Sequence, residues 1–342
     1  RGGAMLSALS LPLVASMLLS ASRLSCAPAR GARVRVARLA ADWTEQQLAS
    51  SWERAGKGRS LWRPGTKTDS PATDARLLFT TWKLNPLELH IYDHCPFCMR
   101  ARLVLGLLKI PHKYVVYGYG AGADPEKCDG NGYGEGPLPL VGKKALPILT
   151  GAGIPSPKWV HDSPQVLKGG LPESLDICSF GGGVAMDGKI APATGREEVK
   201  DWLSRMDTVT GPLLKPRLIK MPIADWADKR DVDYALWRYQ KMGVDIKAAE
   251  AETDVWLKGL TPLLKELDEM LLGEYQLSGS NEEGSTPCLH PWGLSMDDIM
   301  VLPVLRNLSC VKGIEWPERV LAYMQKTCRQ AGITTYEEHA CQ

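Results

Sequence analysis

Four residues, Cys95-Pro96-Phe97-Cys98, stand where a strand pattern gives way to a helix pattern, and this junction constrains the fold more than any other feature of the chain. Residues 87–92 alternate apolar and polar side chains, which is the period of a half-buried strand. Apolar residues at helical spacing follow the motif: Ala101, Val104, Leu105 and Leu108. Cys95 is therefore predicted at a helix N-terminus, where free N–H groups and the helix dipole stabilise a thiolate. Pro96 suits the first helical turn because it has no N–H that needs an acceptor.

This placement predicts thiol–disulfide chemistry. Thiolate is the nucleophile in disulfide exchange, and Cys98, one turn further into the helix, suits a resolving thiol. A Cys-x-x-Cys near a βαβ pattern is typical of thioredoxin-like proteins. A zinc site fits less well, because the chain has no second Cys-x-x-Cys or Cys-x-x-His, and His90 and His94 do not complete a tetrahedron with both sulfurs. A structural disulfide across two residues closes too short a loop to stabilise much.

Length and composition favour a globular protein of more than one domain. The chain has 342 residues, enough for two domains and tails, and its 44% apolar content supports real cores. The net charge of +2 argues against a nucleic-acid partner. The nine cysteines are odd in number and scattered, which indicates a compartment where most thiols stay reduced.

The N-terminal segment has the composition of a targeting peptide. Residues 1–41 contain six Arg, no Lys and no acidic residue, with Ser and Ala throughout. An apolar run at residues 6–19 is too short to span a bilayer. Arg-rich, Ser-rich and acid-poor sequence is typical of organelle transit peptides, and a secretory signal followed by a transit segment also fits. We expect import into an organelle, plastid or mitochondrion; a disordered basic tail is the alternative.

The pattern along the chain predicts four segments: a targeting peptide (1–41), an N-terminal extension or linker (42–85), an α/β domain (86–182) and an all-α domain (195–335). Strand patterns, Gly-rich loops and helix starts alternate in the third segment, whereas helical periodicity fills the fourth. Strands mixed with helices, followed by helices alone, predict an α/β domain and then an all-α domain.

Several local features are expected inside these domains. Loops are expected at residues 118–139, 151–170 and 275–291, and a helix is expected to open at residues 171–177. Ser295 to Asp298 reads as a Ser-x-x-Asp capping box at the start of a helix.

Six stretches, in order, resemble the two-domain glutaredoxins of the glutaredoxin 2 type. They are residues 92–102, 142–149, 172–177, 294–299, 302–308 and 313–317, and the likeness covers about residues 86–335. The resemblance implies glutathione-transferase architecture: a thioredoxin-like domain followed by a helical domain. The chain departs from the family in its longer loops at 118–139 and 151–170, both next to the expected glutathione groove.

The resemblance also implies roles for the motif residues. Cys95 matches the family's nucleophile, and Cys98 matches the second cysteine, which can form a disulfide with it. Leu146-Pro147 matches the family's cis-proline element, in which the backbone of Leu146 pairs with the cysteinyl part of glutathione like an added strand.

Glu173 and Ser174 match the pair that receives the γ-glutamyl group of glutathione. Glu173 is expected to hold the α-ammonium, while the Ser174 hydroxyl and helix N–H groups hold the α-carboxylate. The glycyl carboxylate needs a cation, for which Lys143, Lys144 and Arg100 are candidates.

The sequence thus predicts a glutathione-dependent oxidoreductase that reduces protein disulfides and protein–glutathione mixed disulfides, with glutathione as co-substrate and no metal. Two alternatives stay open. One is a cysteine-type glutathione transferase, against which the retained Cys98 argues. The other is a non-catalytic subunit docked to a large organellar complex, against which the five intact residues Cys95, Cys98, Pro147, Glu173 and Ser174 argue.

Overall fold

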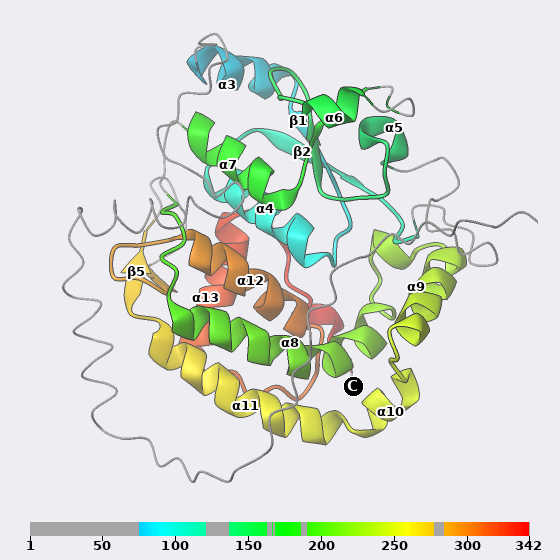
Figure 1. The fold of residues 1–342 in the computed structure, drawn as a ribbon. Helices are drawn as coiled ribbons and strands as arrows, with labels where there is room; N and C mark the ends of the chain where they lie inside the picture. Colours follow the sequence, from blue (N-terminus) through cyan, green and yellow to red (C-terminus); the bar gives the residue numbers. More distant parts are fainter. Residues whose placement is uncertain are drawn as a thin grey trace, which may run out of the picture.

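The computed structural model describes residues 75–120, 137–162, 166, 168–185, 190–276 and 284–341 (Figure 1). The predicted targeting peptide lies outside these residues, as do the larger part of the N-terminal extension and most of the first long loop. The described end of the extension is helix α3 (Ala75–Leu84) rather than linker. Its Phe79 and Trp82 lie three residues apart on one helical face and are buried in the core.

The α/β domain is built on a four-stranded sheet with the order β2-β1-β3-β4. The strands are β1 (Leu87–Ile91), β2 (His112–Val116), β3 (Ile148–Thr150) and β4 (Leu171–Pro172). Strands β1 and β2 are parallel and are joined by helix α4 (Pro96–Leu107), whereas β3 and β4 run antiparallel to their neighbours. Helix α7 (Ser174–Val184) follows β4 and packs against α4 (Figure 1).

The strand register brings distant parts of the chain to one edge of the sheet. Ile91 pairs with Val116, His90 pairs with Ile148, and Ile148 pairs with Pro172. The ends of β1, β2 and β4 therefore meet the beginning of β3. The segments that leave β1 and β4 and the segment that enters β3 carry the predicted site residues, so this edge is where those residues gather.

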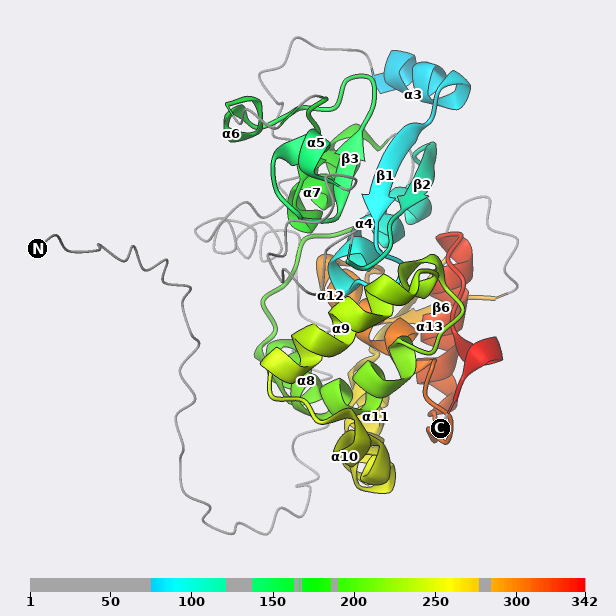
Figure 2. The ribbon, with the colours of Figure 1, turned by 90° about the vertical axis from the view of Figure 1, so that its right-hand side faces the viewer.

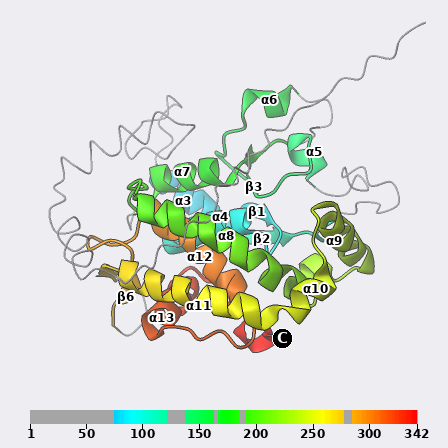
Figure 3. The ribbon, with the colours of Figure 1, turned by 60° about the horizontal axis from the view of Figure 1, so that its bottom comes forward.

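The C-terminal domain is helical, as predicted. Its helices are α8 (Glu197–Leu218), α9 (Lys229–Lys241), α10 (Ile246–Ala251), α11 (Thr253–Met270), α12 (Met296–Leu308) and α13 (Glu318–Gln330), with the short 3-10 helices η1 (Ala224–Trp226) and η2 (Glu337–His339). The long helices α8 and α11 run side by side (Figure 3). Helix α12 packs against both α8 and α4, so one apolar core runs through both domains. Helix α9 lies on the side of the helical domain that faces the end of β1 (Figure 2).

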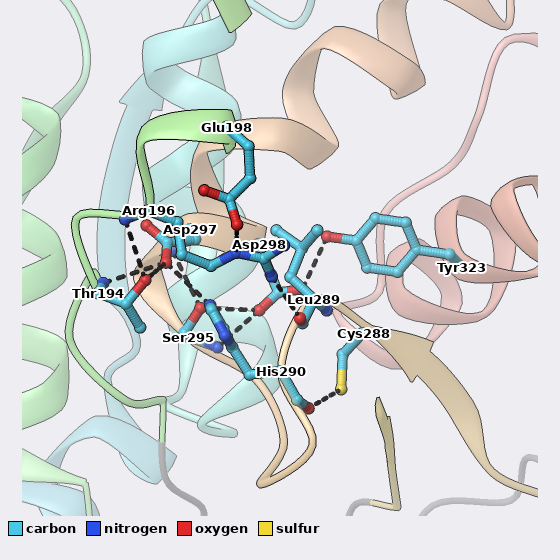
Figure 4. Close-up of polar contacts among 10 residues, drawn as sticks. All are labelled: Thr194, Arg196, Glu198, Cys288, Leu289, His290, Ser295, Asp297, Asp298 and Tyr323. Atoms are coloured by element: carbon cyan, nitrogen blue, oxygen red, sulfur yellow. Dashed lines mark hydrogen bonds and ion pairs between the residues drawn. The ribbon is translucent and has the colours of Figure 1, made fainter. Parts of the chain in front are cut away.

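The capping box at the start of α12 is confirmed, and it belongs to a larger buried network (Figure 4). The Ser295 side chain accepts the N–H of Asp297 at 3.1 Å, while Asp298 accepts the N–H of Ser295 at 2.8 Å. Asp298 also accepts the N–H of Leu289 and the hydroxyl of Tyr323, each at 2.9 Å. This wholly buried carboxylate thus ties the helix start to the preceding loop and to α13.

Three local expectations are wrong, and each fails at a short element. Residues 171–172 form strand β4, and α7 begins only at Ser174. The expected loop at 151–170 contains helix α6 (Lys158–His161), and the expected loop at 275–291 contains part of a hairpin, β5 (Gly273–Tyr275) with β6 (Thr286–Cys288). Elements of two to four residues are too short to show a period in sequence, and their pairing partners decide them.

Within the described ranges, no helix combines the length and the apolar character needed to cross a membrane.

Candidate active site

Cys95 is the N-cap residue of α4, and Pro96 is the first residue of the helix. The backbone of Cys95 is extended, with φ −69° and ψ 122°, and its carbonyl accepts the N–H of Met99 at 2.9 Å. Its side chain is partly exposed, whereas Cys98 is fully buried one turn into the helix. No disulfide joins the two thiols in this structure.

The environment makes these two thiols unequal. A hydrogen bond from the Cys98 thiol, helped by helix N–H groups and by His94, lowers the pKa of Cys95 to about 7 from 9.0 even though burial opposes the shift. Burial, together with the same hydrogen bond, raises the pKa of Cys98 well above its usual value. Near neutral pH, Cys95 is therefore the thiol that ionises, whereas Cys98 stays protonated and donates a hydrogen bond to it.

The other predicted residues come from the same edge of the sheet. The peptide bond between Leu146 and Pro147 is cis, as the family resemblance implied. These residues enter β3 beside the end of β1, and Glu173 and Ser174 leave β4 at the same edge. Ser174 is the buried first residue of α7, so helix N–H groups stand beside its hydroxyl.

Glu173 is the N-cap of α7 and has a left-handed backbone, with φ 71°. Few residues other than glycine adopt such a conformation, and those that do are concentrated at active sites and ligand-binding sites. The Glu173 side chain is 62% exposed, and its carboxylate pairs with Lys143 at 3.4 Å. A charged, accessible carboxylate is what the γ-glutamyl role requires, and that role stays a prediction.

The three candidate cations have different surroundings. The Lys143 ammonium lies 4.6 Å from the centre of the Trp159 ring as well as beside Glu173. Lys144 lies 3.8 Å from the centre of the Tyr234 ring in the helical domain. Arg100 lies over the ring of Phe97, at 4.8 Å, within the redox motif itself.

Four other cysteines of the described part are poor candidates for redox chemistry. Cys178, Cys288, Cys310 and Cys328 are buried, and burial is the main cause that raises the pKa of each to about 12. Such thiols are poor nucleophiles. The described residues contain no cluster of three His, Cys, Asp or Glu side chains suited to a metal ion.

The lowered pKa gives a direct prediction for Cys95. Its alkylation by iodoacetamide should rise with pH and reach half of its plateau rate near pH 7, because only the thiolate reacts. Mass spectrometry of protein quenched at successive pH values would locate the label and give the midpoint. A midpoint near 9 would contradict the placement of a stabilised thiolate at the start of α4.

Comparison with known proteins gives relatives that span both domains. Residues 198–340 match the family described as the glutaredoxin 2 C-terminal domain. Glutaredoxin 2 of Escherichia coli strain K12 is 28% identical over 251 residues, which cover 72% of this chain and 96% of that protein. The crystal structure of glutaredoxin 2 from Salmonella typhimurium, a complex with glutathione, has a TM-score of 0.55 and 26% identity, and the match covers 75% of this chain and 99% of that one.

A thioredoxin-like domain with a dithiol at the start of its first core helix, joined to an all-helical domain, defines a thiol–disulfide oxidoreductase of glutathione-transferase architecture. The relatives match along nearly their whole length and through both domains. The chain is therefore similar to the glutaredoxin 2 proteins through both domains, and the fold class predicted from its sequence is confirmed.

Proposed function

We propose that this protein is a glutathione-dependent oxidoreductase that reduces protein–glutathione mixed disulfides and protein disulfides. The observation that carries the proposal is the pair of unequal thiols at the start of α4, of which Cys95 is the partly exposed thiolate. Its relatives are glutaredoxins, and the Salmonella structure holds glutathione. Glutathione is the co-substrate of the proposed reaction.

The monothiol route uses Cys95 alone. Its thiolate attacks the glutathione sulfur of a mixed disulfide, the S–S bond breaks, and the substrate protein leaves as a thiolate that takes a proton from water. A second glutathione thiolate then attacks the glutathionyl sulfur on Cys95. Oxidised glutathione leaves, and the Cys95 thiolate is restored.

The dithiol route also needs Cys98. After Cys95 attacks a protein disulfide, Cys98 loses its proton and attacks the Cys95 sulfur, which releases the second substrate thiol and leaves a Cys95–Cys98 disulfide. Two glutathione molecules reduce that disulfide and become oxidised glutathione. Cys98 lies in the first turn of α4, directly after the Cys95 N-cap, which places it for this step.

Glutathione is proposed to dock at the sheet edge, with its cysteinyl backbone against Leu146 and its γ-glutamyl group at Glu173 and Ser174. The comparisons lend no support to the non-catalytic subunit or to the cysteine-type transferase.

We also propose import into a plastid or mitochondrion, which rests on the acid-free, Arg-rich residues 1–41. Residues 1–41 fused to a fluorescent protein should direct it to one of these organelles, and a diffuse signal would contradict the import.

The docking site can be tested with Glu173→Ala. Loss of a charge-assisted contact worth about 1.5–3 kcal/mol should raise the KM for glutathione about tenfold or more in the reduction of a small mixed disulfide. The midpoint of Cys95 alkylation should not move, because it depends on Cys98 and the helix end. Glu197→Ala is the control, since Glu197 on α8 is also an exposed carboxylate that pairs with a lysine, Lys200, but does not belong to the proposed glutathione site. If the wild-type protein reduced the mixed disulfide without glutathione, the proposed function would be wrong. If Glu173→Ala left the KM for glutathione unchanged, the proposed glutathione site would be wrong.

A further inference from the structure

The two residues that precede the nucleophile, Asp93 and His94, are held by the helical domain. Asp225, in η1 between α8 and α9, accepts the backbone N–H of Asp93 at 2.8 Å and that of His94 at 3.0 Å. The same carboxylate contacts Nδ1 of His94 and is completely buried. One side chain, more than 130 positions further along the chain, thus holds the two residues that precede Cys95.

The end of α12 holds the carbonyl groups of the same two residues. Arg306 donates to the carbonyl of Asp93 at 2.9 Å and to its carboxylate at 2.7 Å. Asn307 donates to the carbonyl of His94 at 2.7 Å. Each backbone N–H and C=O of Asp93 and His94 is therefore bound by a side chain of the helical domain. Arg102 of α4 adds a 2.5 Å contact to the carboxylate of Asp93.

Burying Asp225 without partners would be costly, since an isolated buried carboxylate is strongly disfavoured. Its three contacts all go to Asp93 and His94, so the carboxylate is stable only while the loop before Cys95 keeps this shape. The His94 ring is further enclosed by Tyr119 and Trp226, each with its centre 4.8 Å away. Asp225 and Trp226 of the helical domain thus enclose this loop together with Tyr119 of the α/β domain.

We propose that Asp225 is a positioning residue of the redox site: it acts through Asp93 and His94 to hold Cys95 at the N-terminus of α4. The helical domain then sets the reactivity of the thiolate as well as covering α4. The inference rests on Cys95 being the nucleophile of the proposed function. The helical domain would then take part in the chemistry, a role that the residues of the Cys95–Cys98 motif do not indicate.

The test is Asp225→Asn in the full-length protein, which keeps the size of the side chain but removes its charge and one acceptor. The alkylation midpoint of Cys95 should rise by about one pH unit, because the loop and the His94 ring are no longer held beside it. Removing the Asp225 charge acts in the opposite direction, but His94 is one of the groups that lower the Cys95 pKa, after the hydrogen bonds from Cys98, and Asp225 is not one of the groups that set it. In steady state, kcat should fall about tenfold while the KM for glutathione stays within about twofold, since glutathione is proposed to dock elsewhere.

The matched control is Asp245→Asn. Asp245 also accepts two backbone N–H groups in the helical domain, those of Lys247 and Ala248, but it does not touch the redox loop. It should leave the midpoint and kcat unchanged. If Asp225→Asn fails to fold, Asn307→Ala decides, because it removes only the donor to the His94 carbonyl and should shift the midpoint in the same direction. A folded Asp225 or Asn307 variant with the wild-type alkylation midpoint and kcat would overturn the proposal. Alkylation of Cys95 needs no glutathione, so the midpoint tests the proposal even if the proposed function fails.

Discussion

Cys95→Ser should abolish both routes of thiol transfer, whereas Cys98→Ser should abolish only the dithiol route. A serine hydroxyl is not ionised at neutral pH, so the first variant has no nucleophile at the start of α4. The second variant keeps the partly exposed Cys95, and glutathione itself can resolve the intermediate on it. The expected loss for Cys95→Ser is at least about 10³-fold, which amounts to removal of the reaction.

Two assays on the same protein separate the roles. Reduction of a glutathione mixed disulfide reports on the monothiol route, and reduction of a protein disulfide reports on the dithiol route. Cys98→Ser should keep the pH optimum of the first assay close to that of the wild type, because the serine hydroxyl and the backbone N–H of residue 98 can still donate to the Cys95 thiolate. Cys341→Ser is the control, since this half-buried cysteine lies at the far end of the helical domain. Equal loss in the two motif variants would show that the roles are assigned wrongly.

Local sequence signals were sufficient where one element decides the geometry. The strand over residues 87–92, the redox motif at the start of a helix and the capping box at Ser295 all follow from short-range periodicity or from capping chemistry. The cis bond before Pro147 followed from the family resemblance instead. In each case the residues that carry the signal are also the residues that make the structure.

The signals failed where a distant partner decides the outcome. Pro172 lies in a strand because Ile148 pairs with it, and nothing in residues 171–177 indicates that pairing. Asp225 shows no motif, yet its carboxylate binds the loop before Cys95. An acidic residue in a short segment between two helices usually reads as a cap or a surface charge, so only its burial and contacts reveal what it does. The part of the site that the sequence hides is the part that the second domain contributes.

Asp298→Ala should cause a large loss of stability, although the residue lies outside the redox motif. The carboxylate accepts the N–H groups of Leu289 and Ser295 and the hydroxyls of Ser295 and Tyr323, and all four donors belong to buried segments. Each buried donor left without an acceptor costs about 1–3 kcal/mol, and part of this cost is relieved when water enters. We therefore expect the free energy of unfolding to fall by about 3–5 kcal/mol and Tm to fall by about 6–15 °C.

Thermal unfolding followed by circular dichroism would measure the change, with Asp245→Ala as the control. Asp245 is an exposed helix cap with two N–H donors, and its loss should cost only about 1 kcal/mol because water replaces the carboxylate. The protein that stays folded should keep the wild-type alkylation midpoint of Cys95, since Asp298 contacts the loop before α12 and α13 but not the redox motif. Equal losses of stability in the two variants would mean that water reaches the Asp298 network. A shifted alkylation midpoint of Cys95 would mean that the start of α12 is coupled to Arg306 and Asn307 at the other end of this helix.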